Sequence, residues 1–279
     1  MPVTGEHLPP ATRAFYRRAI RLLDDAGVPF LVGGAYAFER YTGIARHTKD
    51  LDVFVHPRDF ERGLALFRGA GYATRVSFPH WLGKAYSGDD FVDVIFSSGN
   101  GVAAVDDDWF RHAVDAEVLG MPVRLSPAEE MIWSKAFIME RERFDGADVA
   151  HILRARAEAL DWDRLQRRFQ GHWRVLLAHL VMFGFIYPCE RHRVPAAVMR
   201  ALAARLDDEV DEPAEERLCQ GTLVSRAQYL VDVDEWGYAD ARVAPRGNLT
   251  RRETAIWTAA IAEDGPAAAP PPGDAREAA

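Results

Sequence analysis

Residues 31–55, LVGGAYAFERYTGIARHTKDLDVFV, combine a glycine pair with a strand pattern that carries two carboxylates. The segment predicts a buried strand, a tight turn at Gly33 and Gly34, a short helix, a polar loop and a second strand. In that second strand Asp50 and Asp52 alternate with aliphatic residues, and successive side chains of a strand point to opposite faces. We therefore expect both carboxylates on one face, with the aliphatic side chains in the core.

Two carboxylates about 7 Å apart on one strand face repel each other unless a positive charge lies between them. Mg²⁺ prefers oxygen ligands and is commonly shared between a few carboxylates and substrate phosphates. The glycine pair suits the same ligand, because its backbone N–H groups can approach a phosphate in front of a helix N-terminus. The structural alternative is an ordinary turn and a solvent-facing strand. Phe54 argues against it, because its aromatic ring shares the face of Asp50 and Asp52.

The sequence Gly33-Gly34, a 15-residue gap and Asp50-Leu51-Asp52-Val53 resembles the signature of the polymerase-β-like nucleotidyltransferase superfamily. The long gap resembles that of aminoglycoside O-nucleotidyltransferases, and Arg46-x-Thr48-x-Asp50-x-Asp52 also resembles AbiEii-like toxins. The resemblance covers residues 30–96 well and residues 126–153 loosely. It implies Mg²⁺-dependent transfer of a nucleoside monophosphate from a nucleoside triphosphate, ATP by default, to an acceptor hydroxyl with release of pyrophosphate. Two Mg²⁺ ions, or Mn²⁺ in their place, are the implied cofactors.

Asp93 is an isolated charge in the apolar run FVDVIF, and burying it without a partner would be costly. The resemblance implies that Asp93 completes a metal-binding trio with Asp50 and Asp52 and accepts the proton of the acceptor hydroxyl. Asp89 and Asp90 are the other candidates for the third carboxylate, although they resemble turn residues. The structural alternative is that Asp93 caps a local turn or pairs with an arginine.

Residues 126–144 predict a helix with Ser126 as N-cap and Glu129 in a capping box. Lys135 then lies near an apolar face, where it needs an anion opposite. Toxin-type nucleotidyltransferases carry such a lysine before an Arg-x-x-Asp-like pattern, here residues 143–148. The resemblance implies that Lys135 contacts the triphosphate and that Asp148 orients Lys135 or a metal-bound water; a surface lysine beside the core is the alternative. The expected nucleotide-binding residues are Gly33, Gly34, Arg46, Thr48, Lys135 and Asp148.

The remaining patterns divide the chain into three parts. We expect an α/β (α+β) nucleotidyltransferase domain at residues 1–125, with a mixed sheet flanked by helices. Residues 126–262 predict an all-helical domain that completes the nucleotide and acceptor site. Residues 263–279 are rich in proline and alanine and predict a disordered tail.

Composition excludes some classes of protein. The net charge of −8 argues against a protein whose main task is to coat nucleic acid. Two cysteines are too few for a disulfide framework, and neither a signal-peptide core nor an apolar run of ~18 residues is present. We therefore expect a cytoplasmic protein without membrane contact. The 34 basic residues include only three lysines, which lie in or just after the predicted catalytic half: Lys49, Lys84 and Lys135.

The sequence leaves the acceptor open. A small molecule such as an aminoglycoside, the 3′ end of a tRNA and a protein hydroxyl all fit, and a toxin role implies a cognate antitoxin as partner. A non-catalytic nucleotide-binding or interaction module of the same fold is a competing class, and it predicts Asp93 more than about 7 Å from Asp50 and Asp52. An RNA-binding protein is another, and would use the arginine-rich stretch at residues 154–174, for which a solvated helix face is the simpler interpretation.

Overall fold

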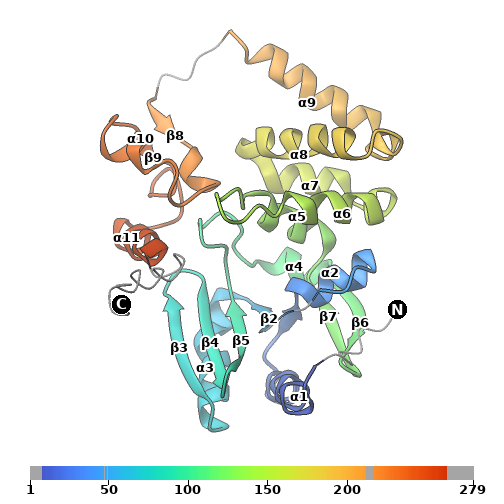
Figure 1. Ribbon diagram of the computed structural model, residues 1–279, viewed down its shortest axis with the longest axis vertical. Helices are drawn as coiled ribbons and strands as arrows, with labels where there is room; N and C mark the ends of the chain where they lie inside the picture. The colour runs from blue at the N-terminus through green and yellow to red at the C-terminus, as the bar shows by residue number, and fades with distance from the viewer. Residues whose placement is uncertain (1–7, 47, 49, 212–215, 263–279) are drawn as a thin grey trace, which may run out of the picture.

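The computed structural model describes residues 8–46, 48, 50–211 and 216–262. Its centre is a mixed seven-stranded sheet with the strand order β3-β4-β5-β2-β1-β7-β6 (Figure 1). Two neighbouring pairs, β2 with β5 and β1 with β7, are parallel, and the other pairs are antiparallel. The strands are β1 (Phe30–Val32), β2 (Asp50–Val55), β3 (Ala73–Phe78), β4 (Leu82–Ser87), β5 (Asp90–Ile95), β6 (Val114–Val118) and β7 (Met121–Leu125).

The two faces of the sheet are covered differently. Helices α1 (Pro10–Asp25) and α3 (Phe60–Gly69), the second preceded by the 3₁₀ turn η1 (Pro57–Asp59), pack on one face. That face carries the buried aliphatic residues of β2, whose exposure alternates along the strand as the sequence predicts. The other face carries the carboxylates of β2, with α2 (Gly34–Thr42) and α4 (Asp107–Arg111) beside them. The mixed sheet with flanking helices confirms the predicted fold class.

The chain after β7 is mainly helical, as predicted, and forms the upper part of Figure 1. It consists of α5 (Ala128–Ala136), α6 (Gly146–Arg156), η2 (Ala157–Ala159), α7 (Trp162–Phe169), η3 (Gln170–His172), α8 (Trp173–Ile186), η4 (Arg191–Arg193) and α9 (Ala196–Asp208). The last described part contains β8 (Leu218–Cys219), η5 (Gly221–Leu223), α10 (Leu230–Asp234), β9 (Ala239–Asp240), α11 (Arg251–Ala259) and η6 (Ala260–Ala262). Residues 216–229 differ from the predicted all-helical domain: they form the two-residue strand β8, the 3₁₀ turn η5 and further turns.

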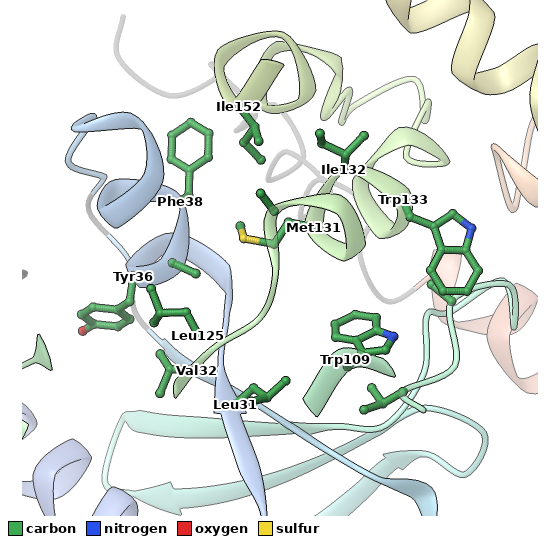
Figure 2. Close-up of a cluster of buried hydrophobic side chains, with 14 of the residues drawn as sticks. Leu31, Val32, Tyr36, Phe38, Trp109, Leu125, Met131, Ile132, Trp133 and Ile152 are labelled. Atoms are coloured by element: carbon green, nitrogen blue, oxygen red, sulfur yellow. The ribbon is translucent and has the colours of Figure 1, made fainter. Parts of the chain in front are cut away.

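A shared hydrophobic cluster joins the helical region to the sheet (Figure 2). Phe38 from α2 lies opposite Ile152 from α6, and Met131 from α5 lies above Leu125 at the end of β7. These side chains are almost completely buried. Burying apolar surface stabilises the folded state by roughly 25 cal/mol per Å². The packing in this cluster therefore stabilises the arrangement of α2, α5 and α6 over the sheet.

The start of α5 differs from the predicted capping box. Pro127 occupies the N-cap position, and the buried Ser126 hydroxyl has no hydrogen-bond partner among the described residues. Glu129 instead accepts a 2.7 Å hydrogen bond from the backbone N–H of Asp161 and pairs with Arg164. The local prediction was wrong because a tertiary partner takes the Glu129 carboxylate. The helix also ends at Ala136, so residues 137–145 form a loop rather than a continuation of the predicted helix.

No helix among the described residues is both long and apolar enough to cross a membrane. The predicted tail at residues 263–279, the first seven residues and Lys49 lie outside the part of the chain that the structure describes.

Candidate active site

The three predicted carboxylates meet on two adjacent parallel strands. Asp52 on β2 lies directly opposite Asp93 on β5, and Asp50 stands two residues before Asp52 on the same face. One carboxylate oxygen from each of the three side chains lies within 4.8 Å of the other two. The separation of more than about 7 Å that a non-catalytic module predicts is therefore not observed.

The glycine turn lies directly against Asp52. The N–H of Gly33 donates a 3.0 Å hydrogen bond to the backbone carbonyl of Asp52. Gly34 has a φ of +53°, and a Cβ at this position would lie 1.6 Å from Oδ2 of Asp52. A Cβ at Gly33 would lie 2.2 Å from the ring of Phe54. Both positions therefore require glycine for steric reasons, and they bring the start of α2 next to the carboxylates.

Lys84 is the ionic partner of Asp93, whose charge would be costly to bury alone. The two residues are directly opposite in the β4–β5 register, and Nζ of Lys84 donates a 2.7 Å hydrogen bond to Oδ1 of Asp93. The same ammonium lies 3.9 Å from the centre of the Phe91 ring. Asp93 thus pairs with a lysine from the neighbouring strand through one of its two carboxylate oxygens.

A second cationic group lies at the junction with the helical region. Nζ of Lys135 on α5 is 2.9 Å from Asp145 and 2.7 Å from Asp148. Arg46, which follows α2, also pairs with Asp148, and Arg143 donates a 2.9 Å hydrogen bond to Asp145. Three cations therefore share these two carboxylates. Arg143 comes from the loop after α5, Lys135 from α5, and Arg46 from the segment before β2. The expected contact between Lys135 and Asp148 is present in the structure.

Thr48 is the remaining predicted nucleotide-binding residue. Its hydroxyl donates a hydrogen bond to Oδ1 of Asp50 rather than pointing away from the carboxylates. It therefore orients the Asp50 carboxylate at the entrance to β2.

The carboxyl groups of the site differ in the direction of their pKa shifts. Burial, together with the charges of Asp50 and Asp93, raises the pKa of Asp52 to about 8. Burial also raises the pKa of Asp93, to about 6, although the hydrogen bond from Lys84 opposes this shift. At Asp145 burial favours a higher pKa, but hydrogen bonds from Arg143 and Lys135 outweigh it and hold the pKa below its usual range. Full ionisation of the three carboxyl groups is therefore unfavourable in the free protein, and a divalent cation would stabilise the ionised form.

Residues 12–181 match the model of a family described as uncharacterised nucleotidyltransferases. The matched range is more than half of the chain and contains all of the residues described above. The chain belongs to this nucleotidyltransferase family. It is accordingly a nucleotidyltransferase, and both its family and its fold are consistent with the polymerase-β-like superfamily.

Several solved structures resemble this nucleotidyltransferase at low sequence identity. The antibiotic-resistance factor ANT(2″)-Ia is 15% identical with a TM-score of 0.44, over 62% of this chain and 98% of that one. The lincosamide antibiotic adenylyltransferase LnuA is 13% identical with a TM-score of 0.37, over 55% and 98%. An antigenic nucleotidyltransferase-like protein from Paracoccidioides brasiliensis is 15% identical with a TM-score of 0.43, over 72% and 100%. No curated protein matches the chain.

The candidate site also contains residues that were not among the predicted site residues. Lys84 and Asp145 each form an ion pair with a predicted residue, Asp93 and Lys135 respectively, and Arg143 pairs with Asp145. Lys84 had one signal in the sequence, the scarcity of lysine, but its pairing with Asp93 depends on strand register. Arg143 and Asp145 lie in the predicted Arg-x-x-Asp-like pattern, whose loop conformation the sequence did not predict.

Two arginines of the arginine-rich stretch at residues 154–174 are engaged inside the protein, whereas Arg154, Arg167 and Arg174 are exposed. Arg164 donates hydrogen bonds of 2.7 and 2.8 Å to Glu130, and Arg168 donates one of 2.6 Å to Asp106. Trp173 and Phe169 are buried. The prediction of a solvated face was wrong for both arginines, and the two aromatic rings are not exposed for stacking on RNA bases.

Proposed function

We propose that this nucleotidyltransferase transfers a nucleoside monophosphate from a nucleoside triphosphate, ATP by default, to an acceptor hydroxyl and releases pyrophosphate. The observation that carries the proposal is the convergence of Asp50, Asp52 and Asp93 beside the Gly33-Gly34 turn. Residues 1–125 would act as the catalytic domain. Residues 126–262 would complete the site, since Lys135 and Asp148 come from them.

The three carboxylates have the donor chemistry that Mg²⁺ or Mn²⁺ requires, and the mutual repulsion that raises the pKa of Asp52 supports the binding of one or two ions. Bound by Asp50, Asp52 and Asp93, Mg²⁺ would supply positive charge to the triphosphate and polarise its phosphorus–oxygen bonds. Thr48 keeps the Asp50 carboxylate in position for this role. Lys84 neutralises part of the charge of Asp93 without occupying its second oxygen.

The triphosphate would lie between the glycine turn and α5. The N–H of Gly33 is already bonded to Asp52, so the backbone N–H groups of Gly34 and the start of α2 would approach the phosphate oxygens, and the helix dipole favours negative charge there. Lys135 and Arg46 would bind the other phosphates and stabilise the charge that develops on the departing pyrophosphate. Asp148 holds both cations and so orients them for this contact.

Asp93 would accept the proton of the acceptor hydroxyl. The hydroxyl oxygen attacks the α-phosphorus, the bond between this phosphorus and the oxygen bridging to the β-phosphate breaks, and pyrophosphate departs. A pKa of about 6 suits a general base at neutral pH, because the carboxylate is then ionised and still basic enough to take the proton.

The strands beyond Asp93 favour a neutral or anionic acceptor. Lys84 on β4 and Arg75 on β3 continue the row that begins with Asp52 and Asp93, so all four side chains share one face. Arg75 is exposed and has no ion pair or hydrogen bond among the described residues, and neither β3 nor β4 contains a carboxylate. A polycationic aminoglycoside would meet repulsion there, whereas the phosphate beside the 3′ hydroxyl of a tRNA would be attracted.

A transfer assay tests the proposal. The protein is incubated with Mg²⁺, each nucleoside triphosphate labelled at the α-phosphate, total tRNA and a panel of aminoglycosides. We expect label on an acceptor with the wild type, and loss of at least about 1,000-fold in Asp50→Asn/Asp52→Asn, since several kcal/mol of charge stabilisation disappears. Asp89→Asn, which changes an exposed carboxylate on the turn before β5, is the matched control. Failure of the wild type to bind any nucleoside triphosphate in the presence of Mg²⁺ would contradict the proposal.

A further inference from the structure

Helix α8 is apolar on every side. Its sequence has no charged residue between Arg174 in its first turn and Glu190 beyond its end. The helix lies between α9 and α7 (Figure 1), and the face that it turns into the protein is buried. A helix that is apolar all round is normally buried on all sides. The outward face of α8 is therefore expected to be covered as well.

That outward face is exposed in the single chain. Val181 and Phe185 are 56% and 77% exposed, and Met182 and Ile186 are exposed as well. Because residues three and four apart are neighbours on a helix surface, these four side chains form one continuous patch, the α8 strip. Soluble monomers rarely expose contiguous apolar surface, and where they do it commonly marks an interaction site. The α8 strip is therefore a candidate interface.

The two ends of the hairpin formed by α8 and α9 carry opposite charges. Glu209, just after α9, pairs with Arg174 at the start of α8, so the two helices run antiparallel. Three exposed carboxylates near Glu209 have no ion pair among the described residues: Asp207, Asp208 and Asp211. At the other end, the exposed side chains of Arg191 and Arg200 have no ion pair or hydrogen bond in the described part of the chain.

The ion pairs within the hairpin do not cancel this difference. Arg174 and Arg205 share Glu209 at the acidic end, and three uncompensated carboxylates remain beside them. At the basic end, Arg193 pairs with Glu158 and Glu190 and leaves Arg191 and Arg200 uncompensated. The hairpin is therefore negative at one end, positive at the other and apolar between them.

We propose that the α8 strip is the interface between two copies of this chain, with their α8 helices antiparallel across a two-fold axis beside Met182. A two-fold interface joins the same patch of both copies, so strip packs on strip. The acidic end of each hairpin then faces the basic end of the other, twice in one dimer. The surface thus complements itself in shape of charge as well as in polarity, which favours a second copy over an unrelated partner.

Sedimentation equilibrium of the full-length chain from about 0.1 to 100 µM tests the proposal, and we expect a reversible equilibrium between monomer and dimer in this range. Phe185→Glu should raise the Kd at least about 30-fold, as for the loss of a central apolar anchor. Phe185 is largely exposed in the single chain, so this variant should keep the fold, which circular dichroism checks. Trp236→Glu places the same charge on an apolar residue that is 57% exposed outside the strip, and should leave the Kd unchanged.

Charge reversal tests the antiparallel orientation. Arg191→Glu/Arg200→Glu makes both ends of the hairpin acidic, and Asp207→Arg/Asp208→Arg makes both ends basic. Each variant alone should dimerise at least about tenfold more weakly than the wild type, because like charges meet at both ends of the interface. An equimolar mixture of the two should regain the wild-type affinity, since opposite charges then meet at both ends.

Cross-linking tests the position of the axis. In the proposed dimer the two Met182 side chains meet, whereas the α-carbons of the two exposed Cys189 residues lie about 20 Å apart at 1.5 Å per residue. A disulfide requires α-carbons within about 7 Å of each other. Met182→Cys should therefore form a covalent dimer when oxidised glutathione is added, and the wild type should not.

Four outcomes would overturn the proposal. A wild type that stays monomeric up to about 100 µM would leave the strip to another occupant, such as a different protein or a lipid surface. The others are a dimer that Phe185→Glu does not weaken, a charge-reversed mixture that dimerises no better than its components, and cross-linking of the wild type as fast as that of Met182→Cys. No measurement involves nucleotidyl transfer, so these outcomes are separate from failure of the proposed function.

Discussion

Nζ of Lys84 donates a 2.7 Å hydrogen bond to Oδ1 of Asp93 across the β4–β5 pair. The contact is partly buried, and the ammonium also lies over the ring of Phe91. Asp93 is therefore the member of the carboxylate trio that a cation from a neighbouring strand contacts directly. The pair keeps one oxygen of Asp93 engaged and the other available for a proton or a metal.

Substitution of Lys84 should change the pH dependence of nucleotidyl transfer. The ammonium lowers the pKa of Asp93 against the effect of burial, which raises that pKa to about 6. In Lys84→Met the pKa of Asp93 rises further, so the acidic limb of the kcat/KM profile should move up by about one pH unit or more. Lys84→Arg keeps a charge and should preserve most of the wild-type profile. An unchanged acidic limb in Lys84→Met would show that protonation of Asp93 does not cause that limb.

Gly34→Ala should inactivate the enzyme through a steric clash. The new Cβ would lie 1.6 Å from Oδ2 of Asp52, so either the turn or the carboxylate must move. A displacement of about 1 Å at a reacting centre costs on the order of 100-fold in kcat/KM. The measurement is steady-state transfer, with folding checked by circular dichroism.

Gly43→Ala is the matched control for this substitution. Gly43 has a φ of +73°, and a Cβ there would have no neighbour within 4 Å. It carries the same left-handed strain as Gly34→Ala, about 1–2 kcal/mol, without touching the carboxylates. Equal losses of activity in both variants would attribute the effect to backbone strain rather than to Asp52.

Asp52→Asn should stabilise the metal-free protein at high pH. The pKa of Asp52 is about 8 in the folded protein, against about 3.9 for an unperturbed aspartate, so the folded state binds more protons between these values. Stability of the wild type therefore falls as pH rises from about 4 to about 8, by at most ~1.4 kcal/mol per pH unit from this group.

Thermal unfolding in EDTA tests whether the stability of the wild type falls as pH rises. The gain in Tm of Asp52→Asn over the wild type should be larger at about pH 8.5 than at about pH 5. Asp89→Asn should show no such trend, and Mg²⁺ should narrow the difference by stabilising the wild type alone. A gain that is the same at both pH values would contradict the raised pKa.

Glu130→Gln should destabilise the junction between the helical region and the sheet. Glu130 is completely buried and accepts hydrogen bonds from Arg164 and Arg168, and Arg168 also reaches Asp106 just before α4. Removing one charge from a buried ionic network costs roughly 3–5 kcal/mol, which urea denaturation would detect. Glu158→Gln, which breaks the surface pair with Arg193, should leave the midpoint nearly unchanged.

The part of the site that lies within one continuous segment was predictable. The alternation of Asp50 and Asp52 with aliphatic residues predicts a half-buried strand, and the exposure of β2 follows that alternation. The Gly33-Gly34 turn was recognisable for a similar reason, because two adjacent glycines after a buried strand indicate a tight turn, and Gly34 has a φ of +53°. These features depend on neighbours in the sequence, and so residue type and spacing are sufficient to find them.

Contacts between distant segments were harder to predict. The nearness of Asp93 to Asp52 requires β5 to pair in parallel with β2, and the resemblance to a known family suggested this where periodicity did not. The pairing of Lys84 with Asp93 depends on the exact register of β4 against β5, in which these two residues are directly opposite. A shift of one residue would place their side chains on opposite faces of the sheet. At Ser126 a correct local pattern failed, because Glu129 found a tertiary partner in Arg164.

The sequence by itself determined the strand that carries Asp50 and Asp52, the glycine turn, the order of sheet and helices, and the nucleotidyltransferase character of the chain. Only the tertiary structure decided which cations balance which carboxylates, and that Arg164 and Arg168 pair with Glu130 and Asp106 instead of facing solvent. The physical reason is that propensity and periodicity act over a few residues, whereas a buried charge is stabilised by whichever opposite charge the folded chain brings within hydrogen-bonding distance.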